Sequence, residues 1–191
     1  MSNTSCDPAA KPGEKPRPAR LRILEAAGPL FYREGFHAVG VDRVIAEAGV
    51  AKATFYKHFP SKDDLILACI GRAEDLTGAV MPDDTGARPF SDYARAMLEA
   101  AGEARCLGCT FQVTVAEFSD PAHPAHAEAR AAKERVLGEL ERRARLQRLP
   151  EPEAAAARVF LLLEGVWAAV RMFGPDAPLA AAGDALDRLT G

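Results

Sequence analysis

Apolar residues recur at helical spacing along most of the chain, and no stretch sustains the strict alternation typical of a half-buried strand. The first apolar stripe contains Leu24, Ala27 and Phe31 and predicts a helix over residues 18–34. Gly35 is well placed to end this helix, because glycine tolerates the backbone conformation of a helix C-cap. The pattern indicates an all-α protein.

Two short helices are predicted next. Asp42 is expected to cap and open a helix that runs to about Ala48, because a carboxylate suits a helix N-terminus. Gly49 then makes a turn into a helix over 52–58, and Pro60 ends it. Two short helices joined by such a turn are typical of a helix-turn-helix, whose second helix lies in the DNA major groove.

Ser61 is expected to cap a fourth helix with Asp63 and Asp64 in its first turn. The apolar stripe of this helix is too wide for one neighbour, so it should pack on both sides and end near Val80, before a loop over 81–86. We therefore divide the chain into three parts, which are a disordered basic arm (1–16), a helix-turn-helix head (17–62) and a helical body (63–191).

Prolines and glycines divide the rest of the body into five predicted helices, at about 89–104, 107–119, 123–148, 152–173 and 177–189. The helix over 123–148 alternates acidic and basic residues, with Arg143 on its charged side, and is expected to be an outer helix with its own salt bridges. The helix over 152–173 is apolar nearly all round, so we expect a partner subunit to cover the part that the body leaves exposed.

The net charge of −3 hides an uneven distribution. Residues 11–62 contain ten Lys/Arg and five Asp/Glu, whereas residues 63–191 contain 14 and 21. A basic head on an acidic body indicates a phosphate-binding surface that faces one way. The arm and the start of the first helix add further cations that either contact DNA or belong to a solvated tail, namely Lys11, Lys15, Arg17, Arg20 and Arg22.

Other protein classes have little support. The polar, proline-rich N-terminus does not resemble a signal peptide, and the longest apolar run, Val159 to Phe173, contains Glu164 and Arg171 and is too short to span a membrane. Four cysteines are too few for a disulfide scaffold, so we expect a reducing cytoplasm. The sequence contains no glycine-rich phosphate loop, G-x-S-x-G or H-E-x-x-H motif, so we do not expect an enzyme.

About 45 residues of the head resemble the TetR family (TetR/AcrR-like) of bacterial transcription regulators in order and spacing. The resemblance rests on Ile23–Ala27, Leu30–Phe31, Gly35–Phe36, Val41–Asp42, Ala48–Val50, Thr54–Phe59 and Ser61–Leu65. One departure is Ile45, where many members carry alanine. The resemblance implies a homodimer joined through its last two helices, with a ligand pocket in each body. A weaker likeness in the body, around Gly108–Phe111, Glu117–Pro124 and Leu163–Gly165, identifies no effector.

The predicted recognition helix supplies most of the candidate DNA contacts. Tyr56 and Lys62 resemble the phosphate contacts of the family. Lys52 and Thr54 are candidates for base edges, because lysine can donate to guanine and threonine can offer a methyl group to thymine. Each side chain has the alternative of lying on a solvated surface. The full candidate set is Arg43, Lys52, Thr54, Tyr56, Lys57, His58 and Lys62.

A few polar groups among apolar body residues suit a small-molecule site, although ordinary core and interface roles remain the alternative. Arg171 would favour an anionic effector and Glu117 a cationic one. The candidate ligand-binding residues are Phe90, Met97, Phe111, Gln112, Val115, Glu117, Trp167 and Arg171.

Cys106 and Cys109 have the spacing of a zinc site, but His123 and His126 lie closer together than the usual histidine pair. We therefore expect reduced structural cysteines, no metal and no cofactor. The function predicted is that of a ligand-responsive repressor, released from a pseudo-palindromic DNA operator by a small-molecule effector. A thiol-redox or metal-responsive repressor that senses through Cys106 and Cys109 is the alternative.

Overall fold

The computed structural model describes residues 17–80, 88–104 and 106–190, and within them the regular secondary structure is helical throughout. The predicted arm and the loop over 81–86 lie outside the described residues. The helices are α1 (Ala19–Glu34), α2 (Val41–Ala48), α3 (Lys52–His58), α4 (Lys62–Val80), α5 (Phe90–Ala101), α6 (Thr110–Glu117), α7 (Pro124–Leu146), α8 (Pro152–Phe173) and α9 (Leu179–Thr190), with a 3-10 turn at Gly174–Asp176.

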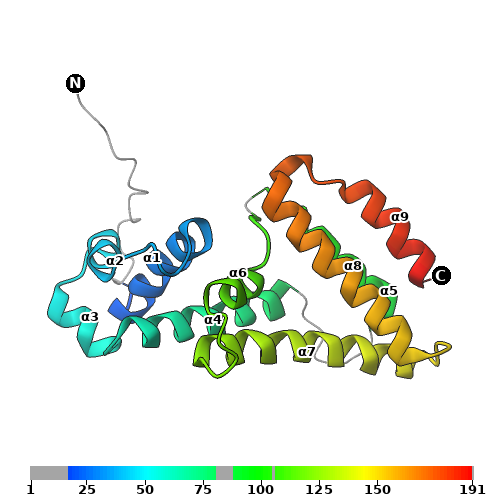
Figure 1. Ribbon diagram of the computed structural model, residues 1–191, viewed down its shortest axis with the longest axis horizontal. Helices are drawn as coiled ribbons and strands as arrows, with labels where there is room; N and C mark the ends of the chain where they lie inside the picture. Colours follow the sequence, from blue (N-terminus) through cyan, green and yellow to red (C-terminus); the bar gives the residue numbers. More distant parts are fainter. Residues whose placement is uncertain (1–16, 81–87, 105, 191) are drawn as a thin grey trace.

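The molecule is elongated, with the head at one end and α5, α8 and α9 at the other (Figure 1). The helix α4 leads from the head along the lower edge, and α7 extends that edge to the far end of the body. The short helix α6 lies between these two ends. Since α4 packs against α1, α6 and α7, it joins head and body as its wide apolar stripe predicts.

Two helix starts test the predicted caps. The Ser61 hydroxyl accepts a hydrogen bond from the amide of Asp64 at 3.1 Å, and the Asp64 carboxylate accepts from the amide of Ser61 at 2.9 Å, which confirms the cap of α4. The predicted cap at Asp42 is wrong. The helix α2 begins at Val41 after Gly40, so Asp42 already lies in the first turn and its side chain caps no amide.

The helix α6 is shorter than predicted because the backbone at Gly108 is not helical. Gly108 has a φ of +99°, and a Cβ atom there would lie 2.6 Å from Cβ of Arg171 and 3.0 Å from the carbonyl oxygen of Trp167. The segment before α6 therefore lies directly against the backbone of α8, and only glycine fits this contact.

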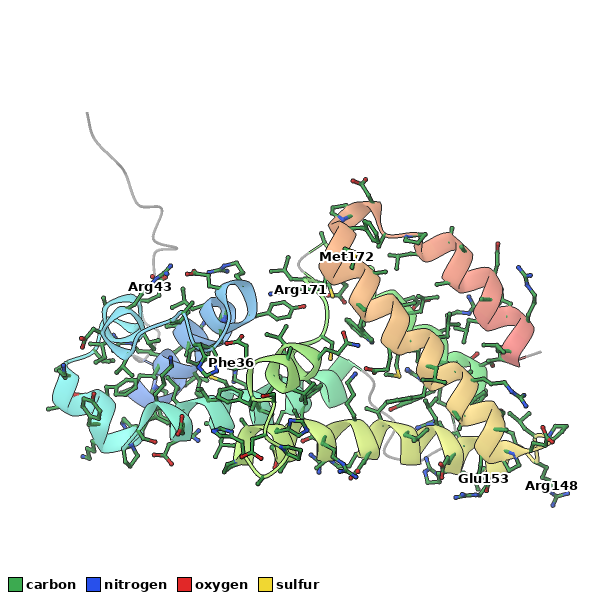
Figure 2. The ribbon with its side chains drawn as sticks, in the orientation of Figure 1. Phe36, Arg43, Arg148, Glu153, Arg171 and Met172 are labelled. Atoms are coloured by element: carbon green, nitrogen blue, oxygen red, sulfur yellow. The ribbon has the colours of Figure 1, made fainter. Side chains whose placement is uncertain are left out.

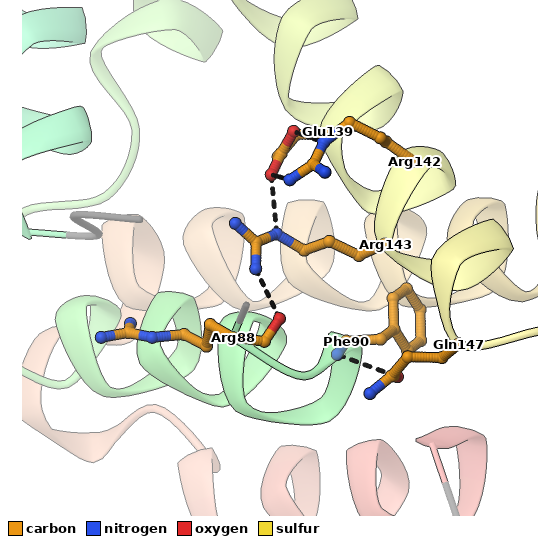
Figure 3. A network of polar contacts seen from close by, with 6 residues as sticks. All are labelled: Arg88, Phe90, Glu139, Arg142, Arg143 and Gln147. Atoms are coloured by element: carbon orange, nitrogen blue, oxygen red, sulfur yellow. Dashed lines mark hydrogen bonds and ion pairs between the residues drawn. The ribbon is translucent and has the colours of Figure 1, made fainter. Parts of the chain in front are cut away.

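At the far end of the body, Arg143 departs from the predicted outer, charged face of α7. Its side chain is only 2% exposed. Its guanidinium donates to the Arg88 carbonyl at 2.6 Å and pairs with Glu139 at 2.7 Å (Figure 3). It also lies over the Tyr93 ring, 4.3 Å from the ring centre. The nearby Gln147 side chain accepts from the amide of Phe90 at 3.0 Å (Figure 3). This network fixes the start of α5 on the end of α7.

Replacing Gly108 with alanine should lower the free energy of unfolding by at least about 1 kcal/mol, because the positive φ and the contact with α8 both oppose a side chain. The matched control is Gly138→Ala on the exposed side of α7, where an added Cβ meets nothing within 4 Å. That change should stabilise the protein by about 0.5 to 1 kcal/mol, as alanine does in a helix. Urea unfolding at one protein concentration measures both, and equal midpoints for the two variants would contradict the argument.

Candidate nucleic-acid interface and body cavity

The corner between α2 and α3 is held by a side chain from α1. Gly49 adopts the left-handed conformation with a φ of +58°, and the Arg22 guanidinium donates to the carbonyls of Ala48 at 2.7 Å and Gly49 at 2.6 Å. Arg22, one of the cations predicted either to contact DNA or to lie in a solvated tail, is thus engaged within the head. Arg17 pairs with Glu25 at 2.9 Å, and the Arg20 guanidinium lies 5.3 Å from the centre of a phenylalanine ring, so both pack on the head.

The helix α3 buries one side and exposes the other. Phe55 is fully buried and packs edge-on against the Tyr56 ring at 5.3 Å between ring centres. The side chains predicted to meet DNA lie around this anchor, with Lys52, Tyr56 and Lys57 exposed and Thr54 and His58 half-buried. Lys62 follows at the start of α4, and Arg43 is exposed on α2.

Three of these cations have partners inside the head. The Lys52 ammonium pairs with the Asp42 carboxylate at 3.0 Å, and Arg43 pairs with Glu34 through its two terminal guanidinium nitrogens. The Lys62 ammonium donates to the carbonyl of His37 at 3.3 Å. The hydrogen bond from Lys52 to Asp42 raises the pKa of Lys52, so this ammonium stays charged over the physiological range. These partners orient the cations before any phosphate arrives.

Glu117, at the end of α6, contacts the head directly. Its carboxylate accepts from the amides of Phe36 at 2.9 Å and His37 at 2.7 Å, just after α1 (Figure 2 labels Phe36). Gly35 leaves room for it, because a Cβ at that position would lie 2.6 Å from a Glu117 oxygen. Glu117 therefore fixes the α1–α2 corner to the body. It does not line the cavity described below, contrary to its predicted place in a ligand pocket.

A second contact with the head lies before the start of α6. The Tyr32 hydroxyl of α1 accepts from the amide of Leu107 at 2.7 Å and donates to the carbonyl of Gly108 at 2.5 Å. Burial raises the pKa of this hydroxyl. Arg171 of α8 donates to the carbonyls of Tyr32 at 2.7 Å and Leu107 at 3.3 Å (Figure 2 labels Arg171). Like Glu117, Arg171 does not line the cavity described below. The segment before α6 is thereby held between α1 and α8.

A cavity of about 940 Å³ lies between head and body. Among the predicted ligand-binding residues, Met97, Phe111 and Trp167 line it. The other five do not. Phe90 is fully buried in the body core, Val115 packs on the core beside the head, and Gln112 donates to Glu164. The predicted residues outside the lining are therefore Phe90, Gln112, Val115, Glu117 and Arg171.

The predicted cysteine and histidine pairs lie at opposite ends of α6. Cys106 and Cys109 precede the helix and line the cavity, together with Cys69 of α4. His123 caps α7 by accepting from the amide of Ala125 and stacks on the Phe118 ring, while His126 contacts the carbonyl of Phe118. The two pairs therefore do not form one metal site, and the part of the chain that the structure describes holds no cluster of three or more potential ligands.

Sequence reasoning missed the contacts of three side chains, which are Arg22 at the α2–α3 corner, Tyr32 before α6 and Lys133 in the cavity lining. Arg22 and Tyr32 occupy positions on α1 outside its apolar stripe, where a helix normally meets water. Arg22 contacts the α2–α3 corner 26 and 27 residues away, and the Tyr32 hydroxyl contacts the segment before α6 up to 76 residues away. The sequence shows only that both side chains end in a polar group. It does not show their partners, which lie far along the chain.

Comparison with known proteins identifies the family of this chain. Residues 23–69 match the model of the bacterial regulatory proteins of the tetR family. SCO4454, a TetR-family transcriptional regulator from Streptomyces coelicolor, is 33% identical with a TM-score of 0.79, and the match covers 90% of this chain and 94% of that one. The chain belongs to the TetR family. It is therefore a DNA-binding transcriptional regulator, and the family is not one of enzymes.

Curated relatives match over a shorter part of the chain. The transcriptional activator FasR of Mycolicibacterium smegmatis is 43% identical over 56 residues, which are 29% of this chain and 26% of FasR. The regulator UidR of Escherichia coli K12 is 32% identical over 77 residues, which are 40% of this chain and 39% of UidR. The chain thus spans well under half the length of these two TetR-family relatives. Within the described residues, no helix has the length and apolar character needed to cross a membrane.

Stability should depend on pH through Cys69. Burial raises the pKa of this thiol to about 12, whereas an unfolded thiol titrates near ~8.5. The folded protein keeps a proton that the unfolded chain releases, so the stabilisation is complete below about pH 8.5 and is lost toward pH 12, by about 1.4 kcal/mol per pH unit. The free energy of unfolding of the wild type should therefore fall more steeply than that of Cys69→Ala between pH 8.5 and 10. Parallel urea-derived curves would contradict this burial.

Proposed function

We propose that this TetR-family chain is a homodimeric, ligand-responsive repressor that leaves a pseudo-palindromic operator when a small molecule fills the cavity between head and body. The proposal is supported by the position of α6, which borders the cavity and contacts the head through Glu117 at its end and through the segment just before its start. Its partners are double-stranded DNA, a second copy of the chain and the effector.

DNA reading is assigned to the exposed side of α3 and its surroundings. Lys52 and Thr54 lie at the start of α3, where a recognition helix meets base edges. Tyr56, Lys57 and His58 follow on the same helix, and Lys62 and Arg43 flank it, which supports contacts with phosphates on both sides. To contact DNA, Lys52 and Arg43 must give up their ion pairs with Asp42 and Glu34. This favours DNA sequences whose contacts compensate for the lost ion pairs.

Dimerisation is assigned to α8 and α9. Leu161, Met172 and Phe173 of α8 are 67%, 76% and 54% exposed, although all three are large and apolar. Exposed residues recur on α8 at 158, 161, 165, 168 and 172, a spacing that places them along one face. A second copy packed on this face removes the apolar side chains from water and brings two heads onto one operator.

Release follows as a population shift. A ligand that prefers a wider separation of α1 and α6 favours a body in which the heads no longer match successive major grooves. Cys106 and Cys109 line the same cavity, which supports a thiol-responsive version of this regulator as the second candidate. In that version, oxidation of the cysteines would replace ligand binding as the signal.

The decisive experiment is DNA binding to the region beside the chain's own gene, measured over a range of salt concentrations. Lys57→Ala should weaken binding to all sequences and reduce the slope of log K against log salt by about one per subunit, because a phosphate contact is lost. Thr54→Ala should instead cost about 1–3 kcal/mol on the operator alone and relax specificity at one base pair per half-site.

Arg145→Ala is the charge-matched control, because Arg145 pairs with Glu153 at the end of the molecule away from the head (Figure 2 labels Glu153). It should leave binding unchanged. Loss of DNA binding on adding diamide in the wild type, but not in Cys106→Ser with Cys109→Ser, would select the thiol-responsive version. Absence of sequence-specific DNA binding under all conditions would reject both.

A further inference from the structure

The walls of the cavity come from both parts of the molecule. Helix α1 of the head contributes Leu24, Phe31 and Tyr32 to one side, and the body contributes Met97, Phe111 and Trp167. A bound molecule therefore touches the DNA-binding head itself as well as the body. Most of the surface it meets is apolar or aromatic, which favours rings over a polar, flexible ligand.

Few polar groups inside are available to orient a ligand. The Tyr32 hydroxyl already accepts from Leu107 and donates to Gly108. Lys133 of α7 differs, because its side chain lines the cavity, is 18% exposed, and has its ammonium 5.8 Å from the centre of the Phe111 ring. An ammonium has three N–H donors, and one of them serves the Glu164 carboxylate.

The surroundings of Lys133 leave its charge accessible. From α8, Glu164 pairs with it, but this carboxylate is shared, since it also accepts from the Gln112 amide of α6 at 2.9 Å. The other charged residues of the lining come from α1, α4 and the end of α5. Glu25 among them is occupied by Arg17 at 2.9 Å and lies 4.0 Å from Arg72. The lining as a whole carries three cations and two carboxylates, namely Arg33, Arg72, Lys133, Glu25 and Glu103.

We propose that the cavity binds a ring-containing, largely apolar organic anion, with its anionic oxygen on Lys133 and its rings between α1 and the Phe111–Trp167 wall. The inference rests on the proposed function, because it names the chemical class of the effector in the same cavity. A carboxylate or sulfonate accepts charge-assisted hydrogen bonds from the donors of Lys133 that Glu164 leaves, while Gln112 continues to hold Glu164.

Two dyes with similar rings and different charge test this class on the full-length protein. The probes are 1-anilinonaphthalene-8-sulfonate, an anion, and N-phenyl-1-naphthylamine, which is neutral. Trp167 is the only tryptophan of the sequence and lines the cavity, so loss of its emission on titration reports binding there. We expect the anionic dye to bind the wild type more tightly than the neutral dye.

Lys133→Met should weaken the anionic dye by about tenfold, the effect of a lost hydrogen bond to a charged group, and leave the neutral dye within about twofold. Because this change leaves Glu164 without its cation, the double variant Lys133→Met with Glu164→Gln removes both charges and should show the same loss. Arg130→Met is the matched control, since Arg130 is a cation of α7 that pairs with Glu134 and does not line the cavity. It should change neither dye.

The outcomes separate the two proposals. If the double variant keeps the wild-type preference for the anionic dye while the neutral dye still quenches Trp167, the cavity binds ligands but the anion assignment is wrong. If neither dye quenches Trp167 in the wild type, the anion assignment and the effector cavity of the proposed function both fail. If only the anionic dye responds to the loss of Lys133, the assignment holds.

Discussion

The arrangement of this molecule depends on one carboxylate. The amides of Phe36 and His37 follow α1, and Glu117 accepts from both across 80 or more residues of sequence. Hydrogen bonds to a charged acceptor are stronger than neutral ones, and a buried amide without a partner is costly. Gly35 makes the contact possible, because a side chain there would occupy the space of the carboxylate.

Glu117 at the end of α6 and the segment just before its start both contact the head. The first turn of α6, at Thr110 and Phe111, borders the cavity. In the proposed mechanism, a ligand that displaces this turn would act on α1 through the adjoining segment, and α1 holds the α2–α3 corner through Arg22. Coupling of this kind needs only short contacts between packed helices, in which two arrangements differ by a few hydrogen bonds.

The fold could be predicted from sequence because its signals are local. The corner glycine Gly49, the cap at Ser61 and the buried anchor Phe55 each act on neighbours within a few residues, and all occur as expected. The exposed cations of α3 followed from the same local pattern. The cap predicted at Asp42 lies two residues after the observed one at Gly40, since a helix start shifts easily between neighbouring positions.

The cavity could not be predicted in the same way. Glu117 and Arg171 are polar residues on apolar helices, which is equally typical of a ligand site and of a contact between domains. Their partners, Phe36 and Tyr32, lie 81 and 139 residues away, and no local pattern encodes such pairs. Lys133 was hidden among the alternating charges of α7, and its place in the cavity depends on how α6 and α8 pack beside it.

The contact between Glu117 and the head is tested most directly by amide hydrogen exchange, measured by NMR in the wild type and in Glu117→Ala. We expect the amides of Phe36 and His37 to exchange much faster in the variant, while the amide of Gly35, which donates to the carbonyl of Phe31 at 2.9 Å, stays protected. Unchanged exchange at Phe36 and His37 would show that Glu117 does not hold the head to the body.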